Sequence, residues 1–324
     1  MSVPATWRER LASSPEALRS IAPPAVLIAL VVIIQVLTPG FVTQESLVVV
    51  LADASMLFIM AAGATFAILL GGIDLSIQAV ASLASVILAQ LLPGYGLLAF
   101  PAAILAGLVF GIVSGFVHVR LRVPSFVATL ATGGVVAGLA LLAAHGRAIT
   151  IEEGGRLNTA WANGSLWGLP TVFFIALAIG ILGFLILRYS HFGRYSIAVG
   201  AGESAAWAAG INVDRTKIIA FAISGTLAAI GGTILACRLS SGSPTLANQL
   251  LLPAIAAVIV GGTAITGGLG GLARTAIGAL IISIVRIGMT FVGVDIFAQQ
   301  AVFGAVLIAA VAITIDRSKM AVIK

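Results

Sequence analysis

The sequence predicts an all-α membrane protein with about ten transmembrane helices, and two observations lead to this fold class. Of the 324 residues, 60% are hydrophobic and only 9% are charged, whereas a soluble domain carries about 25% charged residues. So few charges cannot cover a water-soluble surface of this size, and the apolar excess must face lipid. The apolar residues also form runs of about 20, the length that a helix needs to cross a bilayer core of about 30 Å.

The apolar runs are separated by proline and glycine residues, which commonly end helices. We expect spans near residues 22–38, 47–70, 75–92, 97–118, 124–143, 169–187, 217–237, 250–266, 274–292 and 297–315. The chain has no stretch that suits a soluble domain. We therefore predict a single transmembrane domain over residues 22–316, a cytoplasmic N-terminal segment at 1–21 and a cytoplasmic tail at 317–324.

Positive charge is distributed unevenly between the two ends of the predicted spans. Of the 17 Lys and Arg residues, 13 fall on the side of the termini, while Arg147, Arg156 and Arg238 fall on the other side and Arg286 lies within a span. Cytoplasmic loops carry the excess of Lys and Arg, so both termini are predicted to be cytoplasmic. The first apolar run lacks a small-x-small cleavage site, which favours an uncleaved span over a signal peptide.

The sequence offers little for catalysis or for metal binding. Its three histidines are not in an HExxH arrangement, and it has neither a G-x-S-x-G serine motif nor a phosphate-binding loop ending in Gly-Lys-Ser/Thr. Cys237 is the only cysteine, which excludes an intramolecular disulfide and a cysteine-based metal site. We therefore expect no enzyme activity, catalytic residue, metal or cofactor of this chain's own, and any ATP-driven work would need a partner subunit.

The net charge of +6 does not indicate a nucleic-acid partner. The basic residues are separated by long apolar runs and do not cluster with aromatic residues. A role in membrane orientation explains them better.

Asp74 is the most informative ionisable residue, because charges inside a membrane are costly and usually functional. It follows Gly71 and Gly72, whose backbone freedom can break a helix. Asp74 and Ser76 could then accept hydrogen bonds from the free N–H groups of the next helix. The sequence favours this structural role slightly over direct contact with a transported solute.

Other polar residues in the spans are candidates for a solute pathway or for hydrogen bonds between helices. Asp53 fits a wet outer cavity or a polar contact equally well. Arg286 is expected to extend towards the membrane interface. The uncharged candidates are Gln78, Asn248, Gln249, Gln299 and Gln300.

Two groups of glycines indicate close packing or an irregular backbone. Gly107, Gly111 and Gly115 are spaced by four and give the fourth span a flat packing face. Gly261 and Gly262 open a glycine-rich stretch that suggests a tight crossing or a non-helical backbone beside a cavity. Pairs of glycines end apolar runs on the same side at 71–72 and 261–262, as in an internal repeat, but the similarity is too short to establish one.

Two polar stretches connect the spans. Residues 144–169 are predicted to lie outside the cell, and residues 189–217 form the longest cytoplasmic loop. The centre of that loop is rich in helix formers, with an acidic residue in the first turn and a glycine that can end a helix. A short helix is therefore predicted from Glu203, Ser204, Ala205, Ala206 and Trp207 to Gly210.

The chain resembles a known family, the permease subunits of bacterial ABC importers for simple sugars of the ribose, xylose and galactose type. The resemblance extends from about residue 25 to 317. Its most specific part, residues 71–76, is close to the family's GGIDLSVG-like signature and departs from it at Ile77 and Gln78. Residues 122–130, 212–232 and 254–263 also resemble family segments. Branched-chain amino-acid permeases are more distant relatives, and the Asp74 segment favours the sugar branch.

The resemblance implies a multi-pass protein of the bacterial inner membrane that works with partners. A periplasmic sugar-binding protein would deliver a monosaccharide or a related small polyol, and a second permease copy, identical or not, would complete the pore. An ATP-binding cassette subunit would hold ATP-Mg and contact a coupling helix, which corresponds here to Glu203–Gly210. The family helix is usually more polar, and Ser204 to Trp207 depart from it.

The main alternative is an ion-coupled secondary transporter of a small polar solute. It should carry carboxylates or histidines at mid-membrane depth as relay groups, and only Asp53 and Asp74 come close. An intramembrane enzyme would need a nucleophile or metal cluster, and a membrane scaffold would not need the glycine-broken polar segments.

Overall fold

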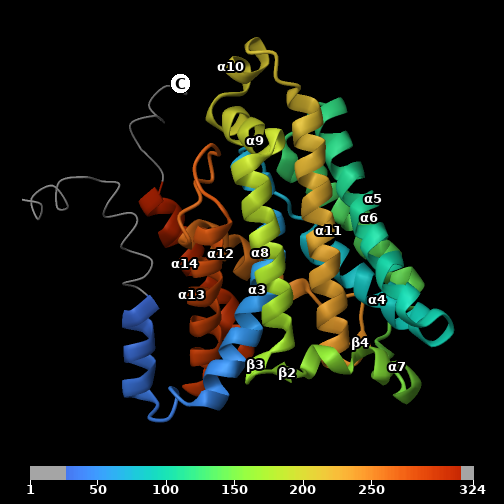
Figure 1. Cartoon of the computed structure of the whole chain (residues 1–324), viewed down its shortest axis with the longest axis vertical. Coiled ribbons are helices and arrows are strands. Elements are labelled where there is room, and N and C mark those ends of the chain that lie inside the picture. The colour runs from blue at the N-terminus through green and yellow to red at the C-terminus, as the bar shows by residue number, and fades with distance from the viewer. Residues whose placement is uncertain (1–26, 315–324) are drawn as a thin grey trace, which may run out of the picture.

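The computed structural model describes residues 27–314, and these form a mostly helical bundle (Figure 1). The predicted segments 1–21 and 317–324 lie outside the described residues. Six stretches are long and apolar enough to cross a membrane, and one of them, Ile77–Arg120, is divided into two helices by a 3-10 turn. The helices of these stretches are α3 (Gln44–Leu69), α4 (Ile77–Tyr95), η1 (Gly96–Leu98), α5 (Ala99–Arg120), α6 (Ser125–Ala143), α8 (Thr171–Tyr189), α11 (Val213–Leu239) and α13 (Leu272–Phe291).

Shorter apolar helices occupy the remaining predicted spans. They are Leu27–Leu37, a stretch formed by η3 (Asn248–Leu250) and α12 (Leu251–Val260), and the apolar part of α14 (Ile296–Thr314). The predicted span 250–266 was too long at its end. The chain leaves the helix at Gly261 because Gly262 has a φ of 97°, a conformation that side-chain-bearing residues rarely adopt.

Small elements cover the two ends of the bundle (Figure 1). At one end lie α9 (His191–Ala201) and α10 (Glu203–Ala208). At the other end lie α7 (Glu153–Thr159), η2 (Ala160–Asn163) and four two-residue strands that the all-α prediction missed. Strand β1 (Ile149–Thr150) pairs antiparallel with β4 (Ser241–Gly242), and β2 (Ser165–Leu166) pairs antiparallel with β3 (Leu169–Pro170).

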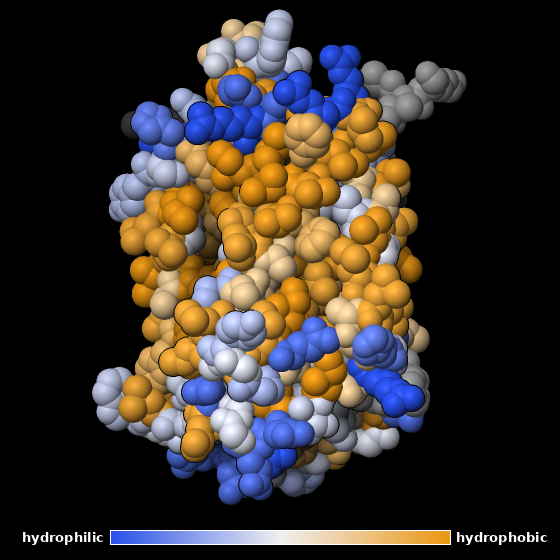
Figure 2. All heavy atoms as spheres, turned by 90° about the vertical axis from the view of Figure 1, so that its right-hand side faces the viewer, coloured by the Kyte–Doolittle hydropathy of each residue, from blue (hydrophilic) through white to orange (hydrophobic). Residues whose placement is uncertain are grey.

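An apolar band separates the two polar ends of the molecule (Figure 2). The pairing of β1 with β4 and the hydrogen bond from the Asn163 side chain to the Arg238 carbonyl bring residues 149–163 and 238–242 together at one end. That end includes the predicted outer stretch 144–169. The opposite end contains the ion pair between Lys217 and Glu203, so the two polar stretches identified in the sequence lie at opposite ends of the band.

Helix α11 lies in the middle of the bundle and packs against α3, α4 and α5. Glycines allow these close contacts. A Cβ at Gly111 or Gly225 would meet the backbone of the facing helix, since α5 and α11 approach each other there. Gly107 and Gly115 face α11 in the same way. Most of α3 is buried, so the helix that leads to Asp74 is enclosed by other helices rather than by lipid.

Candidate functional site

Asp74 lies between α3 and α4, where the chain leaves the helical conformation over residues 70–76. Its side chain is 2% exposed. Oδ1 accepts hydrogen bonds from the Ser76 backbone N–H at 2.9 Å and from the Ser76 hydroxyl at 2.6 Å, and Oδ2 accepts one from the Ser224 hydroxyl of α11 at 2.7 Å. The carboxylate therefore fixes the turn before α4 and joins it to α11, 150 residues later in the chain.

The segment around Asp74 is also held by α6. The Ser125 hydroxyl accepts from the Ile73 N–H at 2.9 Å, and the Thr129 hydroxyl accepts from the Leu75 N–H at 3.0 Å. Two side chains of α6 thus satisfy backbone N–H groups that the break in the helix leaves open. Ser76 is the N-cap residue of α4, but its hydroxyl accepts no hydrogen bond from the helix as the sequence had suggested, and it donates to Asp74 instead.

A second polar group lies near the opposite end of the bundle. Arg286 of α13 forms an ion pair with Asp53 of α3, a partner that the sequence did not indicate. Asp53 has the polar contact that the sequence allowed. Its second oxygen, Oδ2, is buried and has no hydrogen-bond partner among the described residues.

Arg286 also lines a cavity of ≈ 290 Å³ between η3, α13 and α14. The other polar lining residues are Gln249, Thr290, Gln299 and Gln300. Three of the glutamines singled out in the sequence are thus brought together. Asn248 and Gln78 are not among the residues that line this cavity.

The glycine-rich stretch after α12 meets the break after α3. The Gly268 N–H donates to the Leu69 carbonyl at 2.9 Å. A Cβ on Gly200 of α9 would meet the backbone of both Leu69 and Gly268. Gly261 in turn faces the backbone of Arg274, whose guanidinium donates to the Gly262 carbonyl at 3.2 Å. The irregular backbone therefore serves contacts between segments, one of the two roles that the sequence left open.

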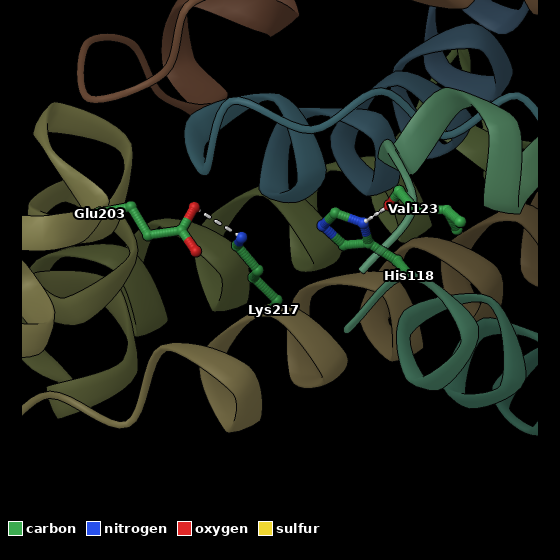
Figure 3. Close-up of polar contacts among 4 residues, drawn as sticks. All are labelled: His118, Val123, Glu203 and Lys217. Carbon is green, nitrogen blue, oxygen red and sulfur yellow. Dashed lines mark hydrogen bonds and ion pairs between the residues drawn. The ribbon is translucent and has the colours of Figure 1, made fainter. Parts of the chain in front are cut away.

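The short helix predicted in the polar loop is present as α10, at the same end of the bundle as α9 (Figure 1). Glu203 is in its first turn, and Gly210 follows it with a φ of 80°. The Glu203 carboxylate pairs with Lys217 Nζ at 2.7 Å, which ties α10 to the start of α11 (Figure 3). Trp207 is 75% exposed, so this helix presents a large aromatic side chain beyond the apolar band.

A second cavity, of ≈ 280 Å³, lies beneath α10. Glu203, Lys217, His118 and the Gly71–Gly72 segment line it. The His118 ring nitrogen Nδ1 contacts the Val123 carbonyl at 2.6 Å, and Lys217 lies between Glu203 and the histidine ring (Figure 3). The sequence did not indicate the contacts of His118 and Ser224, although Ser224 lies within the family-like segment 212–232, because their partners are on other segments of the chain. Nor did it indicate helix α9, which lies directly before α10.

Comparison with known proteins decides the family of this chain. Residues 46–311 match the family described as branched-chain amino acid transport system / permease component. The chain belongs to this family of transport permeases. It is therefore a multi-pass transport protein of the inner membrane, and the resemblance drawn from residues 71–76 and 254–263 is confirmed at the level of the family.

Individual relatives are named for sugar transport. The chain is 35% identical over 291 residues to the ribose import permease protein of Haemophilus influenzae, covering 88% of this chain and 90% of the relative. It is 34% identical to the ribose import permease protein of Escherichia coli over 297 residues, covering 90% and 92%. The L-arabinose transport system permease protein of Escherichia coli is 35% identical over 284 residues, covering 85% and 84%.

Proposed function

We propose that this chain is the transmembrane permease subunit of an ATP-driven importer for a monosaccharide or a related small polyol. The family membership of residues 46–311 makes it a transport permease. The sugar class is supported by relatives named for ribose and L-arabinose that match along most of the chain. The glycine-rich signature around Asp74 favours the same class over an amino acid.

The observation that carries the ATP-driven mechanism is helix α10. It lies at the end that also holds most of the described Lys and Arg residues, and it exposes Trp207 while the Glu203–Lys217 pair fixes its base. An exposed tryptophan on a short, anchored helix suits a protein contact, because aromatic residues are enriched among the residues that dominate binding energy. We assign α10 as the coupling helix for a separate ATP-binding cassette subunit, which would hold ATP-Mg, while this chain binds no cofactor.

The topology that we propose together with this assignment has ten crossings and both termini in the cytoplasm. The six long apolar stretches contribute seven of them, because α4 and α5 turn back at η1. The shorter helices Leu27–Leu37, α12 and α14 would add three. With α10 in the cytoplasm, the β1–β4 and α7 elements face the periplasm and would receive the loaded binding protein. A second permease copy, identical or not, would complete the pore.

Transport in proteoliposomes tests the proposal. The chain would be reconstituted with its ATP-binding subunit and binding protein, and uptake of D-ribose, L-arabinose and L-leucine would be measured with and without ATP. We expect ATP-dependent uptake of a sugar. Uptake driven by an ion gradient without ATP, or uptake of leucine in place of every sugar, would overturn it.

The role of α10 has a separate test. We predict that Trp207→Glu weakens association with the ATP-binding subunit roughly 30-fold or more, as expected for losing an aromatic anchor worth about 2 kcal/mol. Co-purification of the two subunits measures this. Trp167→Glu is the matched control, because Trp167 is also exposed, at 85%, but lies in the stretch at the opposite end. Equal co-purification of both variants and the wild type would contradict the assignment.

A further inference from the structure

The cavity bounded by η3, α13 and α14 has an unusual lining for a membrane segment. Its volume of ≈ 290 Å³ is close to the lower limit of the roughly 300–1,000 Å³ of small-molecule sites. Besides Ile287 and Phe303, its lining consists of one charged and four neutral polar side chains, those of Arg286, Gln249, Thr290, Gln299 and Gln300. Polar residues in membrane helices usually face one another or a water-filled path, and here five of them converge.

Packing between the helices does not use up the hydrogen-bonding capacity of these side chains. The Gln299 amide donates to the Thr290 hydroxyl at 3.2 Å, and the Gln300 amide donates to the Gln249 backbone carbonyl at 3.4 Å. No hydrogen bond is recorded for the Gln249 side chain within residues 27–314. An amide side chain can donate two hydrogen bonds and accept two, so the cavity retains several unused donors and acceptors.

The electrostatics of the cavity favour a neutral ligand. The guanidinium of Arg286 is already paired with Asp53, so the site has no net charge to attract an anion or a cation. A zwitterionic amino acid would find no unpaired charge for its ammonium and carboxylate groups, and only Ile287 and Phe303 for an apolar side chain. A neutral molecule with several hydroxyl groups needs neither, because glutamine amides and a threonine hydroxyl can donate to it and accept from it.

We propose that this cavity binds the hydroxyl groups of the transported polyol at the outer side of the membrane domain. The inference rests on the proposed function, since the outer side follows from placing α10 in the cytoplasm. Gln299 is buried and would hold one hydroxyl group, and Gln249 is exposed and would meet the solute as it enters. The Asp53–Arg286 pair is a positioning element, because it fixes α13 to α3 and keeps the guanidinium at the cavity wall.

The test uses the complete transporter in proteoliposomes and asks which sugar hydroxyl each glutamine recognises. D-ribose, L-arabinose and the 2-deoxy, 3-deoxy and 5-deoxy analogues of D-ribose are the probes, presented with the binding protein. Gln249→Leu and Gln299→Leu are each expected to lower the uptake of the preferred sugar about tenfold, the usual effect of one lost hydrogen bond. The effect should become much smaller for a sugar that lacks the hydroxyl group concerned, as in a double-mutant cycle.

The controls separate a binding role from a structural one. Asn248→Leu changes an exposed amide next to Gln249 that does not line the cavity, and it should leave uptake unchanged. If Gln299→Leu fails to fold, Gln249→Leu still tests the inference, because Gln249 is exposed and its replacement should not disturb folding. The inference would be overturned if a glutamine variant lowered the uptake of every sugar equally, or if neither variant lowered uptake. In both cases normal sugar uptake by the wild type would uphold the proposed function. Absence of all sugar uptake by the wild type would instead overturn the proposed function.

Discussion

Asp74 and Asp53 are both carboxylates within the apolar part of the chain, yet their surroundings differ. Asp74 is 2% exposed and accepts its hydrogen bonds from Ser76 and Ser224. Asp53 is 8% exposed, pairs with Arg286, and leaves one oxygen without a partner in the described part of the chain. The first carboxylate is enclosed by hydroxyl groups, and the second is joined to a guanidinium that borders an open cavity.

This difference shows that one membrane protein can use a carboxylate either to fix a turn or to pair with a charged group beside a cavity. Around Asp74, every partner belongs to a backbone turn or a neighbouring helix, so the residue determines where α4 begins. Around Asp53, the partner faces a cavity, so the residue determines how a charged group is presented to a solute. A buried carboxylate in a membrane sequence is therefore not by itself evidence of a transport path.

The largest effect is expected from breaking the Asp53–Arg286 pair. Arg286→Gln should destabilise the protein by about 3–5 kcal/mol, because it leaves the carboxylate of Asp53 buried without its counter-charge. Thermal unfolding and the monodisperse yield in detergent measure this. The double variant Asp53→Asn with Arg286→Gln removes both charges and should recover most of the loss. A double variant as unstable as the single one would show that packing, not charge, holds α13 to α3.

A smaller loss is expected at Asp74. Asp74→Ala should cost about 1–3 kcal/mol in total, because the hydroxyls of Ser76 and Ser224 can rotate to other acceptors and only the Ser76 backbone N–H loses its partner. Asp74→Asn should cost less, because its amide oxygen can still accept from Ser76. Size-exclusion profiles of the tagged protein report this order. Normal folding of Asp74→Asn with abolished transport would give Asp74 a role in the path and end the contrast with Asp53.

The smallest effect is expected at the exposed ion pair between Glu203 and Lys217. The Glu203 side chain is 60% exposed, so solvent screens the interaction and it should contribute less than about 1 kcal/mol. Glu203→Gln should lower the unfolding temperature slightly at low salt, and the difference should disappear at about 1 M salt. If Glu203→Gln destabilised the protein as much as Arg286→Gln, solvent exposure would not explain a difference in strength between the two ion pairs.

The sequence predicted features that depend on local composition. The break before Asp74 follows from Gly71–Gly72, and α10 follows from helix formers between Glu203 and Ala208. Helix α9 was missed because it contains Gly193 and Gly200, which are poor helix formers. Its position depends on close contact, since Gly200 lies against the backbone of the α3 end. Tertiary packing there overrides local propensity.

The pairings between distant residues could not be predicted from the sequence. Asp53 and Arg286 were considered separately, because nothing in a linear pattern places α3 beside α13. The same limit applies to Ser224 and Asp74, and to the pairing of β1 with β4. The glutamine residues were correctly singled out as polar candidates, but only the arrangement of η3, α13 and α14 brings Gln249, Gln299 and Gln300 to one cavity.

The contact of Gly200 with the ends of two other segments has a mechanical consequence. Backbone lies against backbone there, without side chains that could rearrange between them, so the contact resists compression. Helix α9 directly precedes α10, and a force applied to α10 would pass through α9 to the end of α3 and to the loop before α13. The ends of the two helices that carry Asp53 and Arg286 would then be displaced together, which would link motion at one end of the bundle to the polar cavity nearer the other end.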